Sequence, residues 1–241
     1  MYELLLSSLP SLRTLLTVAP LAAVYTAIIA TIVGKLRLTR QVRTAYTRKI
    51  FHFSIFTMAS VVQLIWHLPG VVVLGTVVTL FVLYATWRGD GYPLYEALAR
   101  PADAPHRTVF IIVPLLTTIA GGVITNSLFP HVAFIGYLVC GWGDAVGEPV
   151  GSRWGQHRYR VPSLSGVPAT RTLEGSSAVF VIGSIAAMLG FYAYGVMRPH
   201  VILAGLACGL AGAIVEAFSN HGLDNLTTQL AASAVAAFLV R

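Results

Sequence analysis

The sequence has little charge: Asp, Glu, Lys and Arg make up only 10% of its 241 residues, whereas 56% are hydrophobic. Soluble domains carry about 25% charged residues because their surface faces water. This shortage excludes a soluble globular enzyme, a disordered chain and a fibrous protein. Long apolar runs take the place of the missing charge, and they predict an all-α, polytopic integral-membrane protein.

Cysteine is almost absent, and no Walker-type P-loop is present. Cys140 and Cys208 both lie in apolar runs, which is typical of small packing residues rather than of a disulfide or a metal pair. The basic residues are dispersed between the apolar runs, so the net charge of +7 does not indicate nucleic-acid binding. The sequence leaves the oligomeric state open.

The apolar runs predict about eight transmembrane helices, since one crossing needs roughly 20 residues. Two of the runs are long enough for two crossings, and each contains a break, at His67-Leu68-Pro69-Gly70 and at Phe129-Pro130-His131. The predicted spans are about 15–34, two within 50–87, two within 108–143, and then 175–197, 199–218 and 223–240.

The basic residues orient these helices. With the N-terminus outside, the inner loops are 35–49, 88–107 and 151–173, with a short one near 219–223. All 16 Lys and Arg residues lie in these loops except Arg13, Arg198 and Arg241, as the positive-inside rule requires. We therefore expect a single domain, residues 1–241, in a prokaryotic inner membrane or an organellar membrane such as the endoplasmic reticulum. Its polar loop at 151–173 would face the cytoplasm.

Acidic residues are also scarce, and most of the nine lie inside or at the edge of apolar spans, where an ionised carboxylate is costly without a partner. The predicted topology brings five of them to the inner ends of four spans: Asp144, Glu148, Glu174, Glu216 and Asp224. Asp144 and Glu148 are four residues apart, on one helix face. A divalent cation would relieve their repulsion, and oxygen ligands suit Mg²⁺. The alternatives are two acids solvated at a helix end, or ion pairs with Arg153 and Arg158.

Two neighbouring segments carry residues that suit an anion. The stretch 151–160 combines glycines with arginines, which can hold phosphate oxygens, although a positive-inside loop has the same composition. Arg171-Thr172-Leu173-Glu174-Gly175 opens an apolar helix, and a helix N-terminus can bind an anion. The helix dipole alone would also favour Glu174 at this position.

Two further segments hold polar residues next to apolar spans. Asp224 and Asn225 follow Glu216 in a short turn and indicate a functional cavity. Arg48 and Lys49 open the second span, where topology alone explains the basic pair. His52 lies about one turn into that apolar helix, where a packed histidine is commoner than a catalytic one.

Four motifs, taken in order, resemble the CTP-dependent lipid kinases of the dolichol kinase and phytol kinase family. They are Arg48-Lys49-x-x-His52, Gly143-Asp144-Ala145-x-x-Glu148-x-x-Gly151-x-x-x-Gly155, Arg171-Thr172-x-Glu174-Gly175 and Glu216-…-Gly222-Leu223-Asp224-Asn225-Leu226. The two middle motifs are also similar to integral-membrane phosphatidate cytidylyltransferases. The chain lacks the Ser-Pro-Lys run of those enzymes, and Arg171 stands where lysine is common in both groups.

The resemblance implies transfer of a phosphoryl group from CTP to the hydroxyl of a membrane prenol (polyprenol, dolichol, phytol or farnesol-like) at the cytoplasmic interface. ATP stays open as the donor. The resemblance implies Mg²⁺ ligands at Asp144, Glu148, Glu174 and Glu216 and catalytic roles for Asp144, Asp224, His52 and Lys49. It implies nucleotide or phosphate contacts from Arg48, Gly151, Arg153, Gly155, Arg158, Arg171, Thr172, Gly175 and Asn225.

Two other functions stay open at this point. A CDP-lipid synthase like the phosphatidate cytidylyltransferases would use the same nucleotide and metal but would release pyrophosphate. An ion-coupled transporter would place its acids near the middle of the membrane, often within inverted repeats. Here the acids are predicted at one face, and the sequence shows no repeat.

Overall fold

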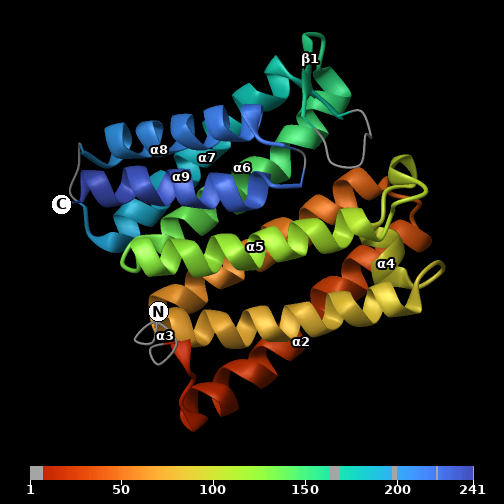
Figure 1. Ribbon diagram of the computed structural model, residues 1–241, viewed down its shortest axis with the longest axis horizontal. Coiled ribbons are helices and arrows are strands. Elements are labelled where there is room, and N and C mark those ends of the chain that lie inside the picture. The colour runs from red at the N-terminus through yellow and green to blue at the C-terminus, as the bar shows by residue number, and fades with distance from the viewer. Residues whose placement is uncertain (1–7, 163–168, 197–199, 221, 241) are drawn as a thin grey trace. The chain divides into compact units, whose positions relative to one another are not determined.

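The computed structural model describes residues 8–162, 169–196, 200–220 and 222–240. The described elements are helices apart from one two-stranded hairpin (Figure 1), which confirms the all-α prediction in its main feature. The chain divides into two compact units, Met1–Ile112 and Val113–Arg241. Arg198, Arg241 and the centre of the predicted inner loop, 163–168, lie outside the described residues.

Among its described residues, the first unit contains three helices and a short 3-10 turn. They are α2 (Leu12–Leu38), α3 (Thr44–Arg88), α4 (Pro93–Leu98) and η1 (Pro101–Asp103). The long helix α3 is kinked, since the backbone of His67 is non-helical, with φ 55° and ψ −156°. Pro69 follows two residues later and lacks the N–H that a continuous helix needs there. The break predicted at 67–70 is therefore confirmed.

The described part of the second unit consists of five helices and the hairpin. They are α5 (Val109–Leu128), which begins just before the unit does, α6 (Ala133–Trp154), β1 (Arg158–Val161), β2 (Ala169–Thr172), α7 (Leu173–Tyr194), α8 (His200–Phe218) and α9 (Asp224–Leu239). The break predicted between α5 and α6 is confirmed at 129–132. Helix α6 packs against α7, α8 and α9 (Figure 1).

The apolar core of this unit lies at one end of its helices. It is formed by the first half of α6, the second half of α7, the first half of α8 and the second half of α9: Phe134, Ile135, Phe191, Val201, Cys208 and Ala236 are among its members. The free cysteine Cys208 is fully buried there, and Cys140 is buried as well, as expected for packing residues. The polar ends of the same four helices are left for the site.

A run of glycines every fourth residue brings α6 against α7. A Cβ at Gly147 would lie 2.8 Å from Val179, and one at Gly151 would lie 2.7 Å from the Thr172 hydroxyl. Gly143 and Gly155 continue the same face towards Val179 and Thr172. Small residues allow two helix backbones to approach closely, and this is a common packing mode within membranes. This row of glycines therefore holds the start of α7 beside the last turns of α6.

The described residues of the segment expected as a polar loop, 151–162 and 169–173, form regular secondary structure at both ends. Its first residues complete α6 as far as Trp154, so Gly151 and Arg153 lie on a helix rather than in a loop. The segments 158–161 and 169–172 then pair as antiparallel strands, with Tyr159 opposite Arg171. The helix continues because its glycines pack against α7, a tertiary contact that composition does not reveal.

Five described helices are long and apolar enough to cross a membrane: α2, α3, α5, α7 and α8. Large apolar side chains on their outer faces are exposed, among them Leu16 and Val24 of α2 and Leu203 of α8. Water would penalise such surfaces, whereas lipid chains match them. These helices are those of a membrane protein.

Candidate functional site

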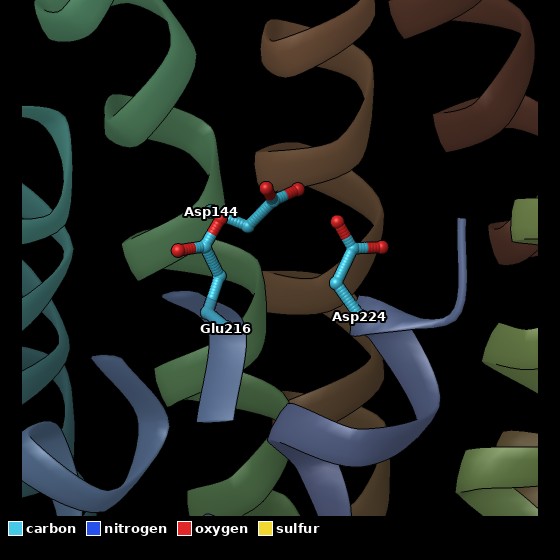
Figure 2. Close-up of side chains that lie close together, drawn as sticks. All are labelled: Asp144, Glu216 and Asp224. Atoms are coloured by element: carbon cyan, nitrogen blue, oxygen red, sulfur yellow. The ribbon is translucent and has the colours of Figure 1, made fainter. Parts of the chain in front are cut away.

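Three carboxylates from three helices converge in the second unit. Asp144 comes from α6, Glu216 from the end of α8 and Asp224 from the first turn of α9, and Figure 2 shows the three side chains close together. Each offers one oxygen, and these oxygens lie within 4.8 Å of one another. Glu216 is only 6% exposed. Like charges this close, with little water around them, repel unless a cation or a shared proton offsets them.

The turn between α8 and α9 places two of the three acids. Gly222 has φ +99°, a conformation that glycine adopts without strain. The Thr117 hydroxyl of α5 donates a hydrogen bond of 2.8 Å to the Gly222 carbonyl. The hydroxyls of Ser219 and Thr227 are 2.6 Å apart and join the ends of the two helices. The turn therefore holds Glu216 and Asp224 at the facing ends of adjacent helices.

Arg171 of strand β2 bridges these same two acids. Its Nε lies 3.0 Å from Oε1 of Glu216, and its Nη2 donates to Oδ2 of Asp224 at 3.0 Å. The three side chains are only 13%, 8% and 14% exposed, in the order Arg171, Glu216, Asp224. The third nitrogen, Nη1, is buried and has no hydrogen-bond partner among the described residues. Arg171 was expected to hold phosphate, and here it neutralises carboxylates.

The start of α7 is capped by its own motif. The Thr172 hydroxyl accepts a hydrogen bond of 3.0 Å from the Gly175 N–H, which is the ordinary N-cap arrangement. Gly175 also packs against α6, since a Cβ there would lie 2.7 Å from the Gly147 carbonyl. Thr172 and Gly175 were expected to contact phosphate. In the structure, Thr172 caps α7 and Gly175 packs at the contact between α6 and α7.

Glu174 and Glu148 lie outside the convergent trio. Glu174 occupies the first turn of α7, with Oε1 2.7 Å from Nδ1 of His157, and it accepts the His157 backbone N–H. Glu148 lies on α6 four residues after Asp144, on the same helix face as predicted. The sequence grouped these five acids together, whereas the structure brings together Asp144, Glu216 and Asp224.

The remaining predicted phosphate contacts fall into two groups. Arg153 and Arg158 are exposed, Arg153 at the end of α6 over the Trp154 ring and Arg158 on β1. Asn225 is buried, and its side-chain amide donates to the Thr118 hydroxyl of α5 at 2.8 Å. Gly151 and Gly155 both lie against Thr172. Asn225 and the glycines thus have packing partners, while the two arginines face outward.

The basic motif of the second predicted span lies in the first unit. Arg48, Lys49 and His52 occupy the first turns of α3, and Lys49 is 9% exposed. The start of this helix is attached to α4, because the Thr47 hydroxyl donates to the Ala97 carbonyl at 2.8 Å. The predicted contributions of these three residues to phosphate binding and catalysis stay predictions.

Sequence reasoning missed three partners that shape the site. His157 holds Glu174, Thr118 holds Asn225, and Tyr159 bonds the Ser176 hydroxyl at 2.7 Å, which attaches the hairpin to α7. The sequence does carry a signal for the contact between α6 and α7, since the glycines at 143, 147, 151 and 155 have the spacing of a helix contact face. It carries none for these three partners. The three side-chain pairs join residues from separate elements, and no local pattern announces them.

Comparison with known proteins gives one relative. The chain is 31% identical over 194 residues to phytol kinase from Synechocystis sp., and the alignment covers 79% of this chain and 77% of the relative. No family model and no solved structure matches the sequence.

Proposed function

Because the chain belongs to the phytol kinase family, we propose that it transfers the γ-phosphoryl group of CTP to the hydroxyl of a membrane prenol. The observation that carries this proposal is the meeting of Asp144, Glu216 and Asp224 with Arg171. Phosphoryl transfer is largely positioning and charge neutralisation. A carboxylate cluster beside an arginine supplies both signs of charge that a metal–nucleotide complex requires.

The trio fits a hard divalent cation. It offers three carboxylate oxygens within 4.8 Å of one another, and Mg²⁺ prefers oxygen ligands. Asp144, Glu216 and Asp224 would hold Mg²⁺, which supplies charge neutralisation at the phosphates when bound. Glu148, one turn along α6 from Asp144, would hold water or extend the ligand set. Asp224 is either a ligand or the group that accepts the proton of the prenol hydroxyl.

Basic groups of the second unit would hold the triphosphate. Arg171 already touches two of the acids, and Arg153 and Arg158 are exposed on α6 and β1, the elements on either side of Gly155. Arginine suits this task because its planar fork donates two parallel hydrogen bonds to a phosphate. No base-reading motif accompanies these groups, so the preference for CTP over ATP rests on the family resemblance alone.

We further infer that the chain crosses the membrane eight times, with the N-terminus outside and the site facing the cytoplasm. With α3 counted as two segments around His67, the long described helices supply one segment for each predicted span. The excess of basic residues in the inner loops supports the orientation. A water-soluble nucleotide and a lipid-soluble alcohol can meet only at a membrane interface, which is where the predicted spans place the acids.

Purified protein in detergent, supplied with Mg²⁺, tests this function. A panel of lipid alcohols, including phytol, farnesol and a long polyprenol, is combined with each of the four nucleoside triphosphates and scored for lipid phosphate. We expect lipid phosphate and CDP with CTP and a prenol. Pyrophosphate released with phosphatidic acid, and no product with any alcohol, would instead identify a CDP-lipid synthase.

A further inference from the structure

Arg171 and the three acids lie on different kinds of element. The acids project from α6, α8 and α9, which pack against one another along their length, whereas Arg171 lies on a four-residue strand paired only with β1 among the described strands. The register places Arg171 opposite Tyr159, and the Tyr159 hydroxyl holds the hairpin to α7 through Ser176. The positive charge is thus delivered to the acids from outside the helix bundle.

Arg171 contacts two of the three carboxylates that a metal ion would need. Its Nε lies against an oxygen of Glu216, and its Nη2 donates to an oxygen of Asp224, each at 3.0 Å. A guanidinium and a divalent cation on the same two carboxylates repel each other and compete for their negative charge. Entry of a cation therefore weakens or breaks at least one of these two ion pairs.

The guanidinium also lacks a partner for one of its nitrogens. Nη1 is buried without an acceptor among the described residues, and a buried unpaired donor carries a free-energy cost. A phosphate oxygen is an acceptor of the right charge, and arginine readily forms paired hydrogen bonds with phosphate. Arg171 therefore pairs with the acids through Nε and Nη2 and keeps Nη1 as a donor for an anion.

We propose that Arg171 is an exchangeable counter-ion: it occupies the acidic trio when no metal is bound and moves to the nucleotide phosphates when the metal enters. The inference rests on the proposed metal centre and adds a property to it. Metal and nucleotide then bind cooperatively, because a phosphate that draws Arg171 away frees the carboxylates for the cation. Such coupling is reciprocal between the two ligands.

The test measures Mn²⁺ binding to the full-length protein in the absence of nucleotide, by the loss of the free-ion electron paramagnetic resonance signal. Arg171→Gln removes the competing charge, and Arg171→Met does so while keeping an apolar stem. Arg171→Lys keeps the charge. Arg160→Gln is the matched control, since Arg160 is an exposed arginine on the neighbouring strand of the same hairpin. Thermal unfolding verifies that each variant is folded.

We expect the two neutral variants to bind Mn²⁺ about tenfold more tightly than the wild type. This corresponds to about 1.4 kcal/mol of binding free energy that Arg171 withholds from the metal. Arg171→Lys and Arg160→Gln should stay within about threefold of the wild type on the same scale. Adding CTP should strengthen Mn²⁺ binding in the wild type and much less in Arg171→Gln. If one neutral variant fails to fold, the other decides the outcome.

Unchanged or weaker Mn²⁺ binding in the neutral variants would overturn the counter-ion role. This result is distinguishable from failure of the proposed function, because lipid phosphate formation by the wild type is measured separately. An active kinase with unchanged Mn²⁺ affinity contradicts only the counter-ion. Tighter Mn²⁺ binding in a protein that phosphorylates no alcohol contradicts only the kinase. Absence of Mn²⁺ binding in every variant contradicts the proposed metal centre and the counter-ion with it, whatever the kinase assay shows.

Discussion

Two arginines in this protein each bridge a pair of carboxylates, and their surroundings differ. Arg107 of the first unit bonds Asp90 at 2.6 Å and Glu96 at 2.9 Å, and it also donates to the Ala99 carbonyl at 3.0 Å. Asp90 is 80% exposed. Arg171 bonds two nearly buried acids beside a third, Asp144. The same residue types thus form a partly solvated cluster in one unit and a nearly buried one in the other.

The difference separates a structural role from a functional one. The Arg107 cluster joins residues that are close in sequence, and it fastens α4 and the segment that leads into α5. The Arg171 cluster gathers side chains from three helices and a strand at the expense of burying several charges, which is rarely a gain in stability. Charged groups that are costly to bury and far apart in sequence are typical of functional sites in membrane proteins.

The largest expected effect is on activity. Asp144→Asn removes one negative ligand oxygen without changing the size of the side chain, and we expect phosphoryl transfer to fall by about 10³-fold or more, as for loss of a key electrostatic group. Asp90→Asn, the same change in the Arg107 cluster, should keep activity within about twofold of the wild type, because exposed ion pairs contribute little. Initial rates of lipid phosphate formation compare the two, and comparable losses in both variants would erase the distinction between the clusters.

The second effect is on stability. Arg107→Gln leaves Glu96, whose side chain is 17% exposed, without its ion pair, and we expect a loss of about 2 kcal/mol in stability. Thermal unfolding should show a midpoint lower by several degrees, while Mn²⁺ affinity stays at the wild-type value. An unchanged midpoint would mean that the Arg107 cluster does not fasten its unit.

A smaller effect concerns pH. Burial raises the pKa of the Glu96 carboxyl, but the Gly91 N–H and Arg107 outweigh it and hold this pKa below its usual value of 4.5. The stabilisation from ionised Glu96 is therefore present above pH 4.5 and is lost as the pH falls through the lowered pKa. Glu96→Gln should reduce the unfolding midpoint at pH 6 and lose this deficit at low pH. An equal deficit at both pH values would show that the ionised Glu96 carboxylate does not stabilise the protein.

The smallest effect is that of Asp90 on stability. Its carboxylate bonds Arg107 but is largely in water, so Asp90→Asn should lower stability by less than about 0.5 kcal/mol. Salt should reduce the effect further, since exposed charges are screened. Thermal unfolding at low and high ionic strength checks this, and a loss as large as that of Arg107→Gln would show that Asp90 carries the cluster.

Much of the fold follows from the sequence because its signals are local. The break at His67 and the gap between α5 and α6 coincide with Pro and Gly punctuation, and the apolar runs predict the helices themselves. The pairing of Asp144 with Glu148 on one face follows from helical spacing. The C-terminal end of α6 was harder to predict, since the helix extends to Trp154 where its glycines pack against Thr172 and α7.

The partners within the site could not be read from the sequence. Glu174 and Asp224 are both acids at the start of a helix, yet one pairs with His157 and the other with Arg171. Which basic group meets which acid depends on how the hairpin lies over α7, and a short polar stretch does not encode that locally. The sequence therefore predicted that acids and arginines gather at the ends of these helices, and the structure shows which of them pair.

We propose above that Asp144, Glu216 and Asp224 hold the cation that contacts the nucleotide phosphates. The most direct test records the electron paramagnetic resonance spectrum of Mn²⁺ bound to the protein with CTP carrying ¹⁷O in its γ-phosphate, without a lipid alcohol. We expect line broadening by ¹⁷O in the wild type and loss of the bound signal in folded Asp144→Asn. An equally strong, equally broadened bound signal in Asp144→Asn would contradict it.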